Sequence, residues 1–419
     1  MMKPIPSALA LVLAATAAPA FAQMGYQPTP APPQATAAQP PAGAEKTVDI
    51  KPSPQALKAI VDLQNAVKAG DAAAIAQKVT AAQAVAKTKE DRYLIAQFQL
   101  KAALAAKDNV ATAAAVDAVA ASGFLEPAKV AALYNGLGSA FYNEKKLDLA
   151  GSAFEKALAI DARNVETLKL LGETRLAQGR KADAVASFQR VIQTMLAAGQ
   201  KPEENVYKRA LGVAYDASLP VSVDLGRQWA AAYPSADSWH NSVAIYRNMM
   251  KPDVEGTLAL LRLLRAANAL TGPDYGIYAT SAADQSNFVE AQSVLDQGLA
   301  AKQINASDAL IKETLAGLKT KPKPTEADLV EAIKSAQSPI ALVRIGDRYY
   351  GLGEYAKAAA VYRQALAKPG VDSAIANLHL GMALARAGDK AGATAALNAV
   401  TGPRAEVAKF WLMYLQSRA

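Results

Sequence analysis

Few side chains in this 419-residue sequence belong to the types that carry catalysis or bind metals. The sequence has no cysteine, which excludes thiolate nucleophiles, disulfides, Cys-ligated zinc and iron–sulfur clusters. Its two histidines, His240 and His379, are far apart and have no partner at the spacing that metal ligands require. We therefore expect no metal site and no cofactor, and we expect both histidines to be ordinary groove or surface residues on helices.

The motifs of common enzyme classes do not appear either. The segment from Gly172 to Gly179 lacks the spacing of a phosphate-binding loop and continues with Arg-Lys, not Lys-Ser or Lys-Thr. There is no Gly-x-Ser-x-Gly nucleophile elbow. The adjacent carboxylates Glu203 and Glu204 lie at an expected helix start, where the helix dipole favours negative charge. The sequence therefore predicts a protein that is not an enzyme.

Residues 1–22 have the three parts of a secretory signal peptide. Lys3 supplies a positive start, residues 8–18 form an apolar run, and small residues precede the expected cleavage after Ala22. This predicts a periplasmic or secreted protein. An uncleaved anchor is the alternative, but the run is short for a bilayer and is broken by Pro19. No later segment of the sequence is long and apolar enough to span a membrane.

Residues 23–52 are rich in Pro, Ala and Gln, and such a segment cannot bury enough apolar surface to fold. We interpret it as a disordered linker, with a tether to the cell wall as the alternative. The net charge of +8 favours anionic surfaces at long range, but the Lys and Arg residues are scattered along the chain with Asp and Glu among them. This indicates a solvated surface, with a basic face for a target as the alternative. Export and the lack of a basic helix argue against nucleic acid as a partner.

The composition of the chain and its recurring helix-start and helix-end residues predict an all-α fold. Apolar residues make up 52% of the sequence and aromatics only 6%, with much alanine, which suits closely packed helices. Strand-type alternation is missing. Helix stops and starts recur about every 15 to 20 residues, as at Gly70-Asp71, Lys107-Asp108 and Gly388-Asp389, or with proline at an expected first helical position (Pro127, Pro202, and Pro339 after Ser338). We expect about ten helical hairpins plus a last helix.

Small and large apolar residues recur at one spacing in four segments. The four sets are Tyr134, Leu137, Gly138, Phe141, Ala150, Phe154 and Ala157; Leu168, Leu171, Gly172, Arg175, Ala184, Phe188 and Val191; Leu342, Ile345, Gly346, Tyr349, Ala358, Tyr362 and Ala365; and Leu380, Gly381, Leu384, Ala393, Leu397 and Val400. These segments resemble the tetratricopeptide repeat, although Arg175 takes a place that is normally aromatic. The glycine and the alanine lie where two antiparallel helices come closest, and stacked hairpins form a superhelix.

The resemblance implies a concave groove lined by the first helix of each repeat. Its groove-facing positions are Asn135, Ser139, Tyr142, Lys169 and Glu173, then Val343, Asp347, Tyr350, Leu378 and Met382. This mixture suits an extended peptide. It does not match the Lys, Asn and Arg set with which some members clamp a terminal carboxylate, because only Lys169 falls in place. The implied function is a periplasmic scaffold for protein or peptide partners of the cell envelope. The alternative is a non-catalytic component of envelope polysaccharide or peptidoglycan synthesis or export.

Other stretches are helical but loosely patterned, namely residues 54–125 and 200–338. Within them, Tyr207, Leu211-Gly212 and Tyr215 look like one altered repeat, and residues 274–299 look like another. The prolines of residues 319–325 end one helix before Thr325 caps the next. We therefore expect an N-terminal array over 53–318, clearest over 131–198, a hinge, and a C-terminal part over 325–419 with repeats at 339–402.

Two apolar stretches allow alternatives. Residues 258–264 are leucine-rich with Arg262 and Arg265 beside them, which fits a helix buried between neighbours, or a helix on a membrane surface. Val407, Phe410, Trp411 and Tyr414 form one stripe at helical spacing. We expect this last helix to cap the final hairpin, with a homodimer contact as the alternative.

Overall fold

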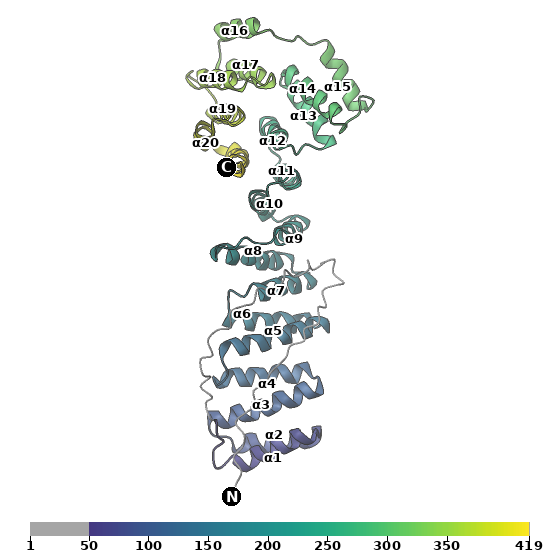
Figure 1. The fold of residues 1–419 in the computed structure, drawn as a ribbon, viewed down its shortest axis with the longest axis vertical. Coiled ribbons are helices and arrows are strands. Elements are labelled where there is room, and N and C mark those ends of the chain that lie inside the picture. Colours follow the sequence, from purple (N-terminus) through teal and green to yellow (C-terminus); the bar gives the residue numbers. More distant parts are fainter. Residues whose placement is uncertain (1–49, 419) are drawn as a thin grey trace, which may run out of the picture. The chain divides into compact units, whose positions relative to one another are not determined.

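The computed structural model describes residues 50–418 (Figure 1). The predicted signal peptide and nearly all of the predicted linker lie outside the described residues, so both remain predictions.

The described residues form helices and no strands, which confirms the all-α prediction. Twenty-one α-helices follow one another between residues 50 and 418, which matches the expected number. Most consecutive helices pack as hairpins, but α15 packs against α13 and α14 whereas α16 packs against α17, so these two do not form one of the ten expected pairs. Their bounds are α1 (Leu57–Ala69), α2 (Ala72–Val85), α3 (Lys89–Ala106), α4 (Asn109–Ser122), α5 (Pro127–Asn143), α6 (Leu147–Ile160), α7 (Val165–Ala177), α8 (Lys181–Ala197), α9 (Glu204–Asp216), α10 (Val221–Ala232), α11 (Ala236–Met250), α12 (Val254–Ala266), α13 (Gly272–Asp284), α14 (Phe288–Ala300), α15 (Ala309–Lys319), α16 (Glu326–Ser335), α17 (Pro339–Gly351), α18 (Tyr355–Leu366), α19 (Ser373–Ala387), α20 (Lys390–Asn398) and α21 (Ala405–Ser417).

The helix ends follow the local chemistry that the sequence indicated. Gly70 ends α1 in the left-handed conformation, and the Asp71 carboxylate accepts hydrogen bonds from the first amides of α2. Lys107-Asp108 and Gly388-Asp389 repeat this arrangement. Pro127 and Pro339 are first helical residues, whereas Pro202 lies before α9, which begins at Glu204.

The described helices group into two compact units, and the boundary between the units falls within α8, between Thr194 and Met195. The expected hinge at residues 319–325 lies inside the second unit. Thr325 does cap α16 there, as predicted. However, one hydrophobic core contains Leu318 and Ile311 from before the prolines and Leu329 and Leu342 from after them. The prolines therefore end a helix without dividing the core.

The recurring glycines lie where the helices of a hairpin touch. A Cβ atom at Gly138 would lie 2.6 Å from the Phe154 ring, and one at Gly172 would lie 2.7 Å from the Phe188 ring. Gly346 is covered in the same way by Tyr362, and Gly381 by Leu397. The four alanines of the pattern, Ala150, Ala184, Ala358 and Ala393, are fully buried. Each predicted packing residue therefore occupies the close contact that its size requires.

The looser segments keep the hairpins but change the contact residues. Gly212 is exposed and a Cβ there would meet nothing within 4 Å, so it is not the contact glycine that the sequence suggested. Instead, Gly226 of α10 lies against Ser242 of α11, whose hydroxyl donates to the Gly226 carbonyl oxygen at 2.6 Å. In the hairpin of α13 and α14, Ala279 takes the place of the glycine and is fully buried.

Within the second unit, α12 is buried on every side. It contacts α11, α13, α19 and α21, and all its leucines, from Leu258 to Leu264, are in the core. This confirms the interpretation as a buried helix and leaves no apolar face for a membrane surface. None of the helices between residues 50 and 418 is long and apolar enough to cross a membrane.

The last helix, α21, packs against both α20 and α12. The Trp411 indole N–H donates to the Ala259 carbonyl oxygen at 3.0 Å, and the Tyr414 hydroxyl donates to that of Ala266 at 3.1 Å. The helix therefore caps the final hairpin, as expected. Because its apolar stripe is buried inside the unit, that stripe cannot also form a dimer contact.

Candidate functional site

In the first unit, the predicted groove residues are accessible. Asn135, Ser139 and Tyr142 on α5, and Lys169 and Glu173 on α7, are all partly exposed. The two helices are in contact, and the Thr167 hydroxyl of α7 donates to Asn135 Oδ1 of α5 at 2.9 Å. These five side chains therefore contribute to one face made by neighbouring first helices. We call these five residues the α5–α7 face.

In the second unit, the equivalent residues are buried, which corrects the prediction that they line an open groove. Asp347 is 2% exposed and Met382 is 0% exposed, and Tyr350, Val343 and Leu378 are buried as well. The reason is α12, which lies against α19 and extends Arg262 over the Tyr350 ring, 4.5 Å from its centroid. A helix of the protein itself occupies the place that a partner would need.

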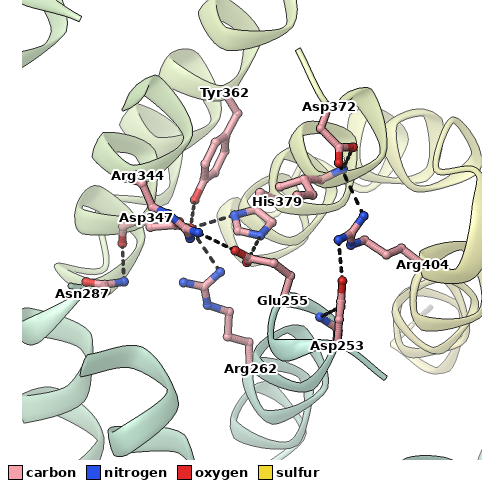
Figure 2. Close-up of polar contacts among 12 residues, drawn as sticks. Asp253, Glu255, Arg262, Asn287, Arg344, Asp347, Tyr362, Asp372, His379 and Arg404 are labelled. Carbon is pink, nitrogen blue, oxygen red and sulfur yellow. Dashed lines mark hydrogen bonds and ion pairs between the residues drawn. The ribbon is translucent and has the colours of Figure 1, made fainter. Parts of the chain in front are cut away.

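A group of charges, buried except for the partly exposed Arg344, joins α12 to the C-terminal repeats (Figure 2). We call it the Arg262 cluster; its six members are Arg262, Arg344, His379, Glu255, Glu290 and Asp347. Arg262 donates two hydrogen bonds to the Glu290 carboxylate, at 2.8 and 2.6 Å, and a third to Asp347 Oδ1 at 3.3 Å. The guanidinium therefore links α12 to α14 and α17 at once.

The Asp347 carboxylate has four hydrogen-bond partners, Arg262 among them. Its Oδ1 accepts from the Tyr362 hydroxyl at 2.8 Å and lies 2.7 Å from His379 Nδ1. Its Oδ2 accepts from Arg344 at 3.4 Å. Burial alone would raise the pKa of Asp347, but the positive charges of His379 and Arg262 outweigh burial and hold that pKa well below its ordinary value.

Glu255 of α12 and His379 of α19 complete the cluster. Glu255 Oε1 accepts from Arg344 at 2.6 Å, and Oε2 lies 3.3 Å from His379 Nε2. Burial would raise the pKa of Glu255, but His379 and Arg344 lower it to about 2. Burial would likewise lower the pKa of His379, but Asp347 and Glu255 raise it to about 9. His379 is thus a buried, charged residue and not the groove or surface residue that the sequence suggested.

Two neutral side chains donate further hydrogen bonds to the carboxylate oxygens of Glu290. The Tyr278 hydroxyl donates to Oε1 at 2.7 Å, and the Asn287 amide donates to Oε2 at 2.5 Å and to the Asp347 carbonyl oxygen at 2.9 Å. The approach of α14 to α17 is close, because a Cβ at Gly351 would lie 2.8 Å from Glu290 Cβ. All these polar groups are buried, so the arrangement offers no surface to a substrate and acts to hold helices together.

A second, partly exposed ion pair lies beside the cluster (Figure 2). Arg404, at the start of α21, pairs with Asp253, whose carboxylate also caps α12. Arg404 lies 3.6 Å from Asp372, which caps α19. The ends of three helices are therefore tied by one guanidinium.

No group of residues able to hold a metal ion occurs within the described part of the chain.

The charge of His379 gives the second unit a pH dependence. A folded-state pKa of about 9, above an unfolded value of 6.5, stabilises the fold fully below pH 6.5. That stabilisation, on the order of 3 kcal/mol at about 1.4 kcal/mol per pKa unit, is lost as the pH rises through 9. We expect the denaturant midpoint of tryptophan fluorescence to fall between pH 6.5 and pH 9, and the fall to vanish in His379→Gln. An unchanged midpoint in the natural sequence would contradict a charged His379.

Comparisons with known proteins support the repeat interpretation. Family models described as tetratricopeptide repeat match residues 131–164 and 343–406. The chain contains tetratricopeptide repeats. The first match covers α6 and α5 from residue 131 onward, and the second covers α18, α19, α20 and α17 from residue 343 onward. The hairpin of α7 and α8 lies outside both matches, and it has the same glycine-to-phenylalanine contact as the hairpin of α5 and α6.

No curated protein matches the sequence. Many solved structures resemble the chain, and among them are the following three, all at low identity. A tetratricopeptide repeat protein from Parabacteroides merdae is 13% identical, with 70% of this chain and 99% of that chain covered and a TM-score of 0.27. A Rap protein complexed with competence and sporulation factor is 11% identical, with 75% and 97% covered and a TM-score of 0.21. The APC/C hetero-tetramer Cut9–Hcn1 is 13% identical, with 87% and 90% covered and a TM-score of 0.19.

Proposed function

We propose that this protein is a periplasmic scaffold that binds an extended segment of a partner protein on the α5–α7 face. The second unit, in this proposal, is a closed module whose own inner face is taken by α12. The proposal rests on tetratricopeptide repeats as a protein-binding fold and on the exposure of one repeat position.

The observation that carries the proposal concerns the residue after each repeat glycine. In the first unit this residue is Ser139 or Glu173, and both are partly exposed. In the second unit it is Asp347 or Met382, and both are buried. The same repeat position is thus open in one unit and covered in the other, so partner contact falls to the first unit.

The chemistry of the α5–α7 face suits a peptide main chain. Asn135 and Ser139 supply an amide and a hydroxyl, Tyr142 supplies an aromatic ring, and Lys169 and Glu173 supply both signs of charge. An extended segment needs hydrogen-bond partners at intervals and apolar contact for alternate side chains. The proposed periplasmic location follows from the signal-like residues 1–22, and it makes envelope proteins the available partners.

Crosslinking in intact cells tests this proposal. A photo-crosslinking amino acid at Tyr142 should yield a discrete adduct with another protein, because Tyr142 lies on the binding face. The same amino acid at Ser152, an exposed residue on the second helix of that hairpin, is the matched control and should yield none. Lys169→Glu should reduce the Tyr142 adduct. Equal adducts from both positions, or none from Tyr142, would refute the α5–α7 face as the binding site.

A further inference from the structure

The second unit has a hollow at its surface whose lining includes no member of the Arg262 cluster. It lies where the chain between α15 and α16 passes the start of α14 and the end of α17. The lining residues are Ser286, Phe288, Val289, Pro322, Lys323, Pro324, Asp328 and Arg348. We call this the α14–α16 hollow.

One part of the α14–α16 hollow is apolar and stiff. Phe288 and Val289, the first two residues of α14, are partly buried and present their side chains to it. Pro322 and Pro324 form another wall, and their rings fix the backbone φ angles of this connection. Such a wall loses little conformational freedom when a ligand packs against it.

The side chains around the hollow carry mainly positive charge. Lys323 and Arg348 line it, and within residues 50–418 neither forms an ion pair with a carboxylate. Lys321 adds a third cation, 5.1 Å above the Phe288 ring. The one lining carboxylate, Asp328, already accepts hydrogen bonds from the Thr325 amide and hydroxyl, at 2.8 and 2.7 Å, as the cap of α16.

We propose that the α14–α16 hollow binds an acidic peptide segment, whose carboxylates pair with Lys323 and Arg348 while a neighbouring apolar side chain lies on Phe288 and Val289. The argument is charge complementarity beside an apolar surface. The two cations attract carboxylates, and Phe288 and Val289 favour a chain that also carries apolar groups. This site is separate from the α5–α7 face, so either proposal can fail without the other.

Fluorescence anisotropy on the mature protein tests the proposal. The probe is a short fluorescein-labelled peptide in which glutamate and leucine alternate. Lys323→Glu/Arg348→Glu should weaken its binding by about tenfold or more, because attraction becomes repulsion at both positions. The matched control is Lys368→Glu/Lys390→Glu, which makes the same charge change at exposed lysines outside the hollow and should leave binding as it is. Tryptophan fluorescence checks that both variants remain folded.

Two comparisons decide the nature of the occupant. A peptide with glutamine in place of glutamate should bind weakly or not at all, and a short single-stranded DNA should not compete with the glutamate peptide. The proposal is overturned if the Lys323→Glu/Arg348→Glu variant binds as well as the control variant. It is equally overturned if binding never saturates, if the glutamine peptide binds as tightly, or if the DNA competes better.

Discussion

Replacing Arg262 with methionine should destabilise the second unit by about 3–5 kcal/mol, the cost of leaving buried carboxylates without their cation. Asp347 would still have His379 and Arg344 beside it. Glu290 would have no cation left beside it, because its other hydrogen-bond partners are the neutral Tyr278 and Asn287. A buried carboxylate with neutral partners alone is costly, since the interior cannot solvate its charge.

Denaturant unfolding measures this effect in one unit at a time. All three tryptophans, Trp229, Trp239 and Trp411, lie in the second unit, so their fluorescence reports that unit alone. Circular dichroism reports the helices of both units. The part of its unfolding transition that comes from the first unit should keep the same denaturant midpoint. Arg265→Met is the control: this half-buried arginine of the same helix bonds to the neutral Gln297 and Ser293, so its loss should cost about 1 kcal/mol.

A second substitution separates charge from packing. If Glu290 loses its only cation in Arg262→Met, then Glu290→Gln in the same chain should recover part of the lost stability, because a neutral amide needs no counter-charge. Equal destabilisation by Arg262→Met and Arg265→Met, with no recovery from Glu290→Gln, would show that the cluster contributes only packing.

Local features of the fold could be predicted from the sequence because they depend on contacts close along the chain. Gly138 meets Phe154 within one hairpin, and Asp71 caps the helix that it precedes. Such contacts repeat at a fixed spacing or follow from one residue type, so a single sequence contains the signal. The same holds for Thr325, whose capping of α16 was predicted even though the prolines before it do not divide the core.

The covering of the second inner face could not be predicted in this way. It depends on pairs such as Trp411 with Ala259 and Arg262 with Asp347, which are 152 and 85 residues apart. No repeat spacing encodes these contacts, and the residue type at a groove position such as Met382 does not predict that the position is buried. One signal was available: Arg262 stands among leucines that are buried on every side of α12, and a charge in such a helix requires a partner of opposite sign. Which carboxylate would supply it could not be read from the sequence.

The covering of that inner face by α12 is the central claim, and cysteine labelling tests it directly, because the natural chain has no cysteine. Single-cysteine variants at Ser139 and Met382 compare the same repeat position in the two units. Met250→Cys, at a methionine that is 52% exposed in the second unit, is the control for a large accessible side chain.

We expect maleimide to react with the cysteine at 382 about a hundredfold more slowly than with those at 139 and 250, because reaction at 382 requires α12 to move away, and a local opening of about 2.7 kcal/mol already gives that factor. Labelling at 382 as fast as at 139, in a protein that keeps its native tryptophan fluorescence, would mean that α12 does not cover the inner face and that both units are open to partners.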